Sequence, residues 1–231
     1  MLKVASYNIH KSIGTDRRRN PGRTIEVLNE LDADIIALQE ADRRFGRRAA
    51  AIPELMLQQY SDYRAVPLDV QNDSMGWHGN AILVRKSANV LMHDIIHIPY
   101  LEPRGAVLAQ IDINGTSLSV LGMHLDLSGL WRRRQAAAII KLAKEHGRHL
   151  PTVLMGDLNE WSASGGCLSD FGRSFHFIPC GRSFHARGRV AELDRIMHCD
   201  RLKPLDCGVL NSASSRKASD HLPIWADIGL A

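Results

Sequence analysis

Three short tracts place acid, amide and imidazole side chains directly beside the apolar runs of expected strands. They are Gln39-Glu40, Gly156-Asp157-Leu158-Asn159 and Ser219-Asp220-His221. Side chains at strand ends can converge on one site, and these groups are what a hydrated magnesium ion and a reacting phosphate need. The tracts therefore indicate metal-assisted phosphate chemistry.

The strands that precede these acidic residues support a functional role for them. Side chains alternate along an extended segment, so Asp157 and Asn159 should point the same way while Leu158 points into the core. Gly, Asp and Asn also dominate turns that have no function, so a simple turn is an open alternative. Thr152–Met155 is an expected buried strand that would deliver the pair to a sheet edge. Glu40 also follows a buried strand, and Mg²⁺ prefers one or two carboxylates plus waters and substrate oxygens.

Two histidines and a further acid are candidates for proton transfer. His221 follows Asp220 just before the last expected strand, and histidine is well suited to proton transfer near neutral pH. Asp194 lies in an apolar stretch, where a buried carboxylate needs a partner. A histidine is a natural partner and would be held in its cationic form. His124 ends a hairpin strand, where a core histidine with satisfied hydrogen bonds is an equally good interpretation.

Amides and arginines supply the remaining candidates. Asn8 ends the first expected strand and Asn80 starts another, although either amide could belong to a turn. Arg104 could clamp phosphate oxygens. Four basic runs are interpreted as solvated faces: Arg17-Arg18-Arg19, Arg43-Arg44, Arg47-Arg48 and Arg132-Arg133-Arg134. The last run opens an expected helix, where arginine is poorly placed against the helix dipole, and this hints at an anionic neighbour.

Composition sets broad limits. The length of 231 residues predicts a single domain over residues 1–231. The hydrophobic share of 45% is ordinary for a globular chain with a full core. The net charge of +4 suits an anionic substrate without proving one. The four cysteines form no CxxC pair, which favours free thiols in a reducing compartment. Neither a signal segment nor a spanning apolar run is found, so we expect a cytoplasmic protein without stable membrane insertion.

Hydrophobic patterning predicts many strands and a few helices. The expected strands are Leu2–Ile9, Ile35–Leu38, Tyr63–Val66, Asn80–Val84, Val90–Ile98, Gly105–Ile113, Ser117–Leu125, Thr152–Met155, Glu192–Met197, Leu205–Val209 and Ile224–Ile228. The expected helices are Pro21–Leu31 with Asn20 as N-cap, Arg47–Gln59 disturbed by Pro53, and Trp131–His146 stopped by Gly147; residues 162–172 are expected to be a loop. Asn114-Gly115 predicts a hairpin turn. The pattern favours an α+β fold with two sheets packed face to face and helices outside.

Taken together, these motifs resemble the endonuclease/exonuclease/phosphatase superfamily. The motifs that carry the resemblance are Tyr7-Asn8-Ile9, Leu38-Gln39-Glu40, Gly79-Asn80-Ala81, His124, Gly156-Asp157-Leu158-Asn159, Leu193-Asp194-Arg195-Ile196 and Ser219-Asp220-His221. The resemblance implies a four-layer α/β/β/α sandwich of two mixed sheets flanked by helices. It also implies hydrolysis of a phosphoester with Mg²⁺ or Mn²⁺.

The same resemblance implies roles for individual residues. Asn8, Glu40 and Asp220 correspond to metal-site residues. Asp157 and Asn159 correspond to the pair that orients or activates the attacking water, and Asp194 corresponds to the partner of His221. His124, Asn80 and Arg104 correspond to groups that hold or polarise the phosphate.

Three functions compete on this basis. The first is a nuclease acting on DNA or RNA, which the net charge and arginine runs favour. The second is a phosphodiesterase or phosphatase acting on a lipid or small-molecule phosphoester. The third is a non-catalytic nucleic-acid-binding regulator, although a complete set of acids and histidines argues against it. We expect a monomeric, metal-dependent phosphodiester hydrolase whose substrate is nucleic acid.

Overall fold

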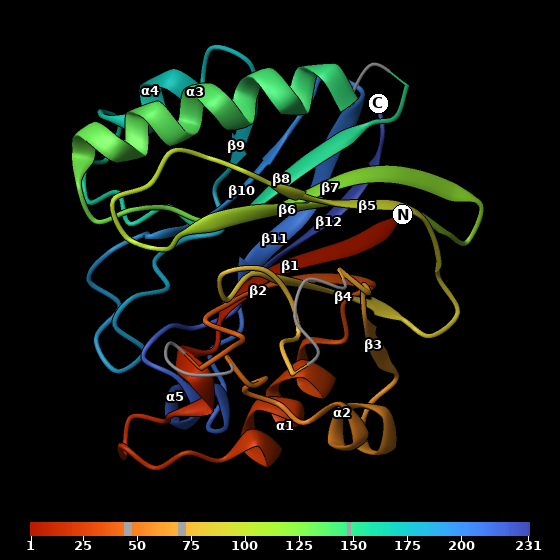
Figure 1. The fold of residues 1–231 in the computed structure, drawn as a ribbon, viewed down its shortest axis with the longest axis vertical. Coiled ribbons are helices and arrows are strands. Elements are labelled where there is room, and N and C mark those ends of the chain that lie inside the picture. The colour runs from red at the N-terminus through yellow and green to blue at the C-terminus, as the bar shows by residue number, and fades with distance from the viewer. Residues whose placement is uncertain (44–47, 69–72, 147–148) are drawn as a thin grey trace.

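The computed structural model describes residues 1–43, 48–68, 73–146 and 149–231. Two six-stranded sheets pack face to face in this part of the chain, and helices cover the outer face of each sheet (Figure 1). The arrangement confirms the expected α+β class and the four-layer α/β/β/α sandwich. None of the described helices is long and apolar enough to cross a membrane.

The strands are β1 (Leu2–Asn8), β2 (Ile35–Gln39), β3 (Tyr63–Ala65), β4 (Ala81–Arg85), β5 (Asn89–Ile96), β6 (Gly105–Ile113), β7 (Thr116–His124), β8 (Thr152–Asp157), β9 (His176–Ile178), β10 (Asp194–His198), β11 (Leu202–Val209) and β12 (Ile224–Leu230). The helices are α1 (Pro21–Leu31), α2 (Glu54–Tyr60), α3 (Gly129–His146), α4 (Cys167–Phe171) and α5 (Ser215–Ala218), with a 3₁₀ turn, η1, over His10–Ser12.

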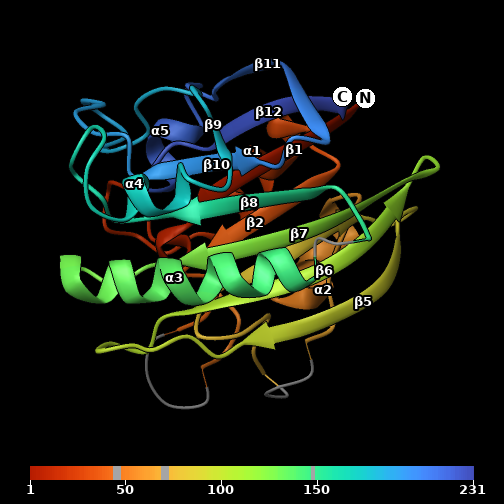
Figure 2. The same cartoon turned by 90° about the horizontal axis from the view of Figure 1, so that it is seen from above.

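Both sheets mix parallel and antiparallel pairs. The first has the order β11-β12-β1-β2-β4-β3 and the second the order β5-β6-β7-β8-β10-β9. β1 and β2 run parallel in the first sheet, as do β7 and β8 in the second. The carboxyl ends of β2, β7 and β8 therefore lie at one side of the molecule (Figure 2).

Three apolar clusters join the four layers. Between the sheets lie Val4, Ile35, Val120 and Val153 among others, all fully buried. A second cluster packs α1 and α2 on the first sheet, and a third packs α3 and α4 on the second. Burial of these side chains is the main favourable term that holds the layers together.

The local signals at α1 and at the hairpin are confirmed. The Asn20 side chain accepts a hydrogen bond from the Arg23 backbone N–H at 3.2 Å, as an N-cap should. Asn114 and Gly115 take φ values of 52° and 73° between β6 and β7, as the hairpin turn requires.

The second helix is shorter than expected. It begins at Glu54, directly after Pro53, and not near residue 47. The segment before Pro53 pairs with the chain after β2 instead, because Ala51 N donates to Ala41 O at 2.6 Å. Arg44 and Arg47 of the predicted basic runs, and Gly147 as the predicted C-cap of α3, lie outside the described residues.

Four short elements of the described residues were not predicted from the sequence patterns. They are η1, α4, α5 and β9, each of three to five residues. The expectation of an uninterrupted loop over residues 162–172 was therefore wrong at α4. Elements this short have too few residues to show a hydrophobic period.

Candidate functional site

Side-chain alternation brings three of the predicted residues into one row. Val120, Val153 and Ile196 face the space between the sheets. His124, Asp157 and Asp194 lie an even number of residues away on the same strands, so they point into the same space. The register pairs His124 with Asp157 and Asp157 with Asp194. The row across β7, β8 and β10 thus stands where the apolar core ends.

The Asp157 carboxylate is the centre of this row and is almost completely buried. The Asn8 amide, from the opposite sheet, donates to its Oδ2 atom at 3.0 Å, and the Asn159 backbone N–H donates to its Oδ1 atom at 2.9 Å. His124 Nε2 lies 3.4 Å and His221 Nε2 lies 3.8 Å from the same Oδ2. Burial alone would raise the pKa of Asp157, but the charge of His221 and the hydrogen bond from His124 outweigh it and hold the pKa well below its usual range.

His221 and Asp194 form a buried pair. The His221 Nδ1 atom lies 2.8 Å from the Asp194 Oδ2 atom, which also accepts a hydrogen bond from the Ser183 hydroxyl. Burial would lower the pKa of His221, but the carboxylates of Asp194 and Asp157 outweigh burial and raise this pKa to about 10. The pair therefore keeps the ring cationic at neutral pH, and its Nε2 faces Asp157.

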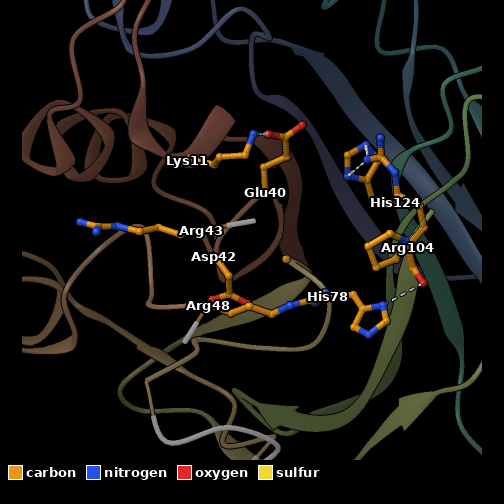
Figure 3. A pocket seen from close by; sticks show the side chains of 10 residues that line it. Lys11, Glu40, Asp42, Arg43, Arg48, His78, Arg104 and His124 are labelled. Carbon is orange, nitrogen blue, oxygen red and sulfur yellow. Dashed lines mark hydrogen bonds and ion pairs between the residues drawn. The ribbon is translucent and has the colours of Figure 1, made fainter. Parts of the chain in front are cut away.

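Glu40 lies at the wall of an open pocket. Its carboxylate pairs with the Lys11 ammonium, whereas His124 and Arg104 project from the opposite side of the pocket (Figure 3). Burial opposes ionisation of Glu40, but the charges of His124 and Lys11 prevail and lower its pKa. A charged carboxylate therefore stands at the pocket wall at neutral pH.

The backbone around Glu40 explains its position. Glu40 adopts a left-handed φ of 53° immediately after β2, which turns its side chain out of the strand direction. Gly79 packs against this bend with a φ of 82°, and its carbonyl accepts a hydrogen bond from Ala41 N at 2.8 Å. A Cβ atom on residue 79 would lie 3.4 Å from the Glu40 Cα, and its positive φ favours glycine.

Among the described residues, two groups of side chains offer ligand atoms for a cation. The first is Asp157, Asp194 and His221, whose ligand atoms lie within 4.8 Å of one another. These atoms already bind each other, and a metal there would have to displace the proton between His221 and Asp194. The second is Asn8, Glu40 and Asp220, which offer oxygen donors at neighbouring strand ends, and its two carboxylates are partly exposed. Hard oxygen ligands with room for water suit Mg²⁺ or Mn²⁺, so the second group fits the metal better.

The remaining predicted residues differ in their surroundings. Arg104 lies against the His124 ring, with its Nη1 atom within hydrogen-bond distance of the ring nitrogens, and both line the pocket. Asn80 is fully buried behind the pocket wall, where its Nδ2 atom donates to Gly105 O at 3.0 Å. The side-chain amide of Asn159 donates a hydrogen bond to Leu125 O at 2.9 Å. Direct contact of Asn80 with a substrate therefore stays a prediction.

Sequence patterns missed several residues of the pocket. Arg43 and Arg48 line it together with His78, although their runs were interpreted as solvated faces. The spacing of these arginines gave no signal, because their place depends on how the segment after β2 folds back. Lys11 was also missed, although it stands three residues from Asn8.

The unusual placement of Arg132 at the start of α3 has an explanation. Its guanidinium forms a buried ion pair with Glu160 at 3.2 Å, and the Glu160 carboxylate accepts from Ser162 N at 3.1 Å. The anionic neighbour expected from the helix dipole is thus Glu160, the residue after Asn159. This pair anchors the loop that carries Asn159 at the site.

Comparison with known families agrees with this geometry. The model of the Endonuclease/Exonuclease/phosphatase family matches residues 5–221. The chain belongs to this family. Family membership makes it a phosphoester hydrolase, and dependence on a divalent metal is typical of the family.

Solved structures share the fold. An endonuclease/exonuclease/phosphatase from Bacteroides vulgatus is 18% identical, with a TM-score of 0.78 over 100% of this chain and 99% of that one. A mannosyl-6-phosphatase from Bacteroides thetaiotaomicron is 18% identical, with a TM-score of 0.76 over 99% and 100%. TDP2 from D. rerio, complexed with a single-strand DNA product, is 17% identical, with a TM-score of 0.77 over 99% and 98%. A search of the curated proteins gave no match.

The His221–Asp194 pair yields a pH prediction. We expect Asp194→Asn to lower the pKa of His221 from about 10 towards its ordinary value of about 6.5, because the largest favourable charge is removed. In the wild type, the raised pKa stabilises the fold fully below about pH 6.5, and this contribution is lost as the pH rises through the folded pKa. NMR titration of the imidazole signals of the metal-free protein, assigned with His221→Ala, measures the shift. An unmoved titration in Asp194→Asn would refute the pairing.

Proposed function

We propose that the chain is a Mg²⁺- or Mn²⁺-dependent phosphodiesterase that cleaves nucleic acid. The observation that carries the hydrolytic part is the row of His124, Asp157 and Asp194, closed by His221 and opening on the pocket that holds Glu40. Negative and positive groups face one another there across a gap in which a phosphate can lie. The metal would neutralise a phosphate oxygen.

Each residue has a role in this proposal. Asn8, Glu40 and Asp220 would hold the metal. Asp157, with Asn159, would orient the water whose oxygen attacks phosphorus. The lowered pKa of Asp157 makes it a weak base. Its role would therefore be to orient the water through its negative charge rather than to accept a proton from it.

The cationic groups would act on the phosphate itself. His221 would face the phosphate as an imidazolium, with Asp194 fixing its ring, and would supply a proton to the leaving oxygen as the phosphorus–oxygen bond breaks. The proton that the attacking water loses would then return the imidazole to its cationic form. His124 and Arg104 would stabilise the charge that develops on the other oxygens. Arg104 has a planar fork that suits phosphate, and its position beside His124 places both groups on one side of the pocket.

Two features favour nucleic acid over a small phosphoester. Arg43, Arg48 and Arg104 give the pocket a cationic lining.

The second feature is an exposed tryptophan. Trp161 is 64% exposed and stands two residues after Asn159, with its ring edge-on to Phe184 at a centroid distance of 5.8 Å. Phe184 in turn lies 4.9 Å from the His221 ring. An exposed aromatic ring separated from His221 by one further ring offers a stacking surface for an unpaired base.

Activity on a substrate panel tests the proposal. The panel contains plasmid DNA, single-stranded oligonucleotides, a bis-aryl phosphodiester, sphingomyelin and phosphate monoesters, each with and without Mg²⁺. Mg²⁺-dependent cleavage of nucleic acid is expected. Turnover of sphingomyelin or of a monoester alone would favour the second function. Binding of nucleic acid without turnover of any substrate would favour a regulator.

Binding without turnover gives a sharper prediction. Asp157→Asn should bind single-stranded DNA with a negative slope of log affinity against log salt, because bound cations are released from the phosphates. Adding Trp161→Ala should weaken this binding by roughly 5- to 150-fold, since stacking contributes about 1–3 kcal/mol per base. Tyr60→Ala is the control, because it removes a 57% exposed ring from the end of α2. Equal binding with and without Trp161 would remove the stacking surface from the proposal.

A further inference from the structure

The turn that follows β1 has an unusual backbone. His10, Lys11 and Ser12 take φ values of 45°, 58° and 59°, so three consecutive residues other than glycine are left-handed. Such runs are costly, and they persist only where the surroundings hold them. Ser12 N donates to Ile9 O at 2.8 Å and Ile13 N donates to His10 O at 2.9 Å, which closes the turn.

This turn contacts all three proposed metal ligands. The His10 backbone N–H donates to Asn8 Oδ1 at 3.1 Å, and the His10 Nδ1 atom lies 3.7 Å from Asp220 Oδ1. Lys11 binds Glu40 twice, through its backbone N–H to Glu40 O at 3.1 Å and through its ammonium to the carboxylate. The left-handed turn therefore places a backbone N–H on the side-chain oxygen of Asn8 and a positive charge on the carboxylate of Glu40.

We propose that Lys11 is an exchangeable counter-ion of this site. Its ammonium pairs with Glu40, and it would turn to a phosphate oxygen when a divalent cation takes the carboxylate. A compact charge on a flexible four-carbon stem can make this exchange, whereas the rigid fork of an arginine cannot follow it as well. Figure 3 shows the ammonium directed at Glu40 within the same pocket that Arg104 and His124 enter.

The exchange couples two binding events. The metal must displace the ammonium from Glu40, which weakens metal binding. A phosphate that accepts the displaced ammonium recovers part of this loss. The two ligands should therefore raise each other's affinity, and the coupling must be reciprocal.

Calorimetric titration with Mn²⁺, with and without sulfate as the phosphate analogue, tests the inference on the full chain. Lys11→Met should bind Mn²⁺ roughly five- to tenfold more tightly than the wild type, the scale of a partly exposed ion pair. It should also lose the increase in Mn²⁺ affinity that sulfate causes in the wild type. Lys11→Arg should keep the weak Mn²⁺ binding but show a smaller effect of sulfate. Lys144→Met, which removes an exposed charge from α3, is the control for net charge.

The inference rests on the metal role proposed for Glu40, and Glu40→Gln separates the two. If Glu40→Gln loses Mn²⁺ binding while Lys11→Met matches the wild type with and without sulfate, the metal role stands and the counter-ion role of Lys11 is refuted. If Glu40→Gln binds Mn²⁺ as the wild type does, both fail. Thermal unfolding of each variant confirms that the comparison is between folded proteins. Weaker Mn²⁺ binding by folded Lys11→Met would also overturn the inference, because it would make Lys11 a support of the metal site.

Discussion

Replacing Glu40 by glutamine should lower metal-dependent turnover by roughly 10³-fold or more. A bound metal supplies several kcal/mol of charge stabilisation in the transition state, and each 1.36 kcal/mol is a factor of ten in rate. Glutamine keeps the shape of the side chain but removes the charge that the lowered pKa of Glu40 secures at neutral pH. The effect should appear in kcat/KM and should not be recovered fully at high Mg²⁺.

The fold should survive this change. Glu40 lies beyond the last residue of β2, and its side chain is 22% exposed at the pocket wall. Glu26→Gln, which removes the same charge from an exposed position on α1, is the matched control and should keep wild-type turnover. A folded Glu40→Gln with undiminished Mg²⁺-dependent activity would remove this residue from the metal role.

Asp157→Asn should lower kcat by about 10²–10⁴-fold with little change in KM, which is the scale of a lost proton-transfer or water-orienting group. The amide keeps the size of the carboxylate but cannot accept from Asn8, Asn159 N–H and His124 in the same way, and it carries no charge to face His221. The pKa of His221 should fall as well, because Asp157 is one of the carboxylates that raise it. A change confined to KM would assign Asp157 to substrate binding.

Steady-state kinetics at saturating substrate and metal separate these outcomes. Asp170→Asn offers a comparison at a carboxylate of α4 that pairs with Arg133 on α3 and with Arg173 just after α4, where turnover should be unaffected. Thermal unfolding must accompany the kinetics, because removal of a buried carboxylate from a cationic histidine can also destabilise the fold. The assignment of Asp157 requires a low kcat in a protein that is still folded at the assay temperature.

Local patterns in the sequence determined most of the elements and the faces of the strands. Alternation along β7, β8 and β10 determines which side chains face the space between the sheets. The N-cap at Asn20 and the turn at Asn114-Gly115 each depend on only a few neighbouring residues. These signals are local, so the sequence alone predicted that His124 and Asp157 stand at strand ends. It placed Asp194 inside the expected strand Glu192–Met197, whereas the structure begins β10 at Asp194. The rule that a buried carboxylate needs a partner predicted a histidine beside Asp194, and the family resemblance identified that histidine as His221.

Tertiary structure alone decided which distant groups meet. The hydrogen bond from Asn8 to Asp157 joins two sheets across 149 positions of sequence, and no period along either strand encodes how the sheets stack. The same holds for Arg132, whose partner Glu160 is set by packing of α3 over the second sheet. Lys11 reaches Glu40 only because a left-handed turn follows β1, and such a turn leaves no hydrophobic period in the sequence. The spacing of residues along a strand specifies the face of the sheet on which each side chain lies. Which side chain it meets there depends on how the sheets and helices pack together.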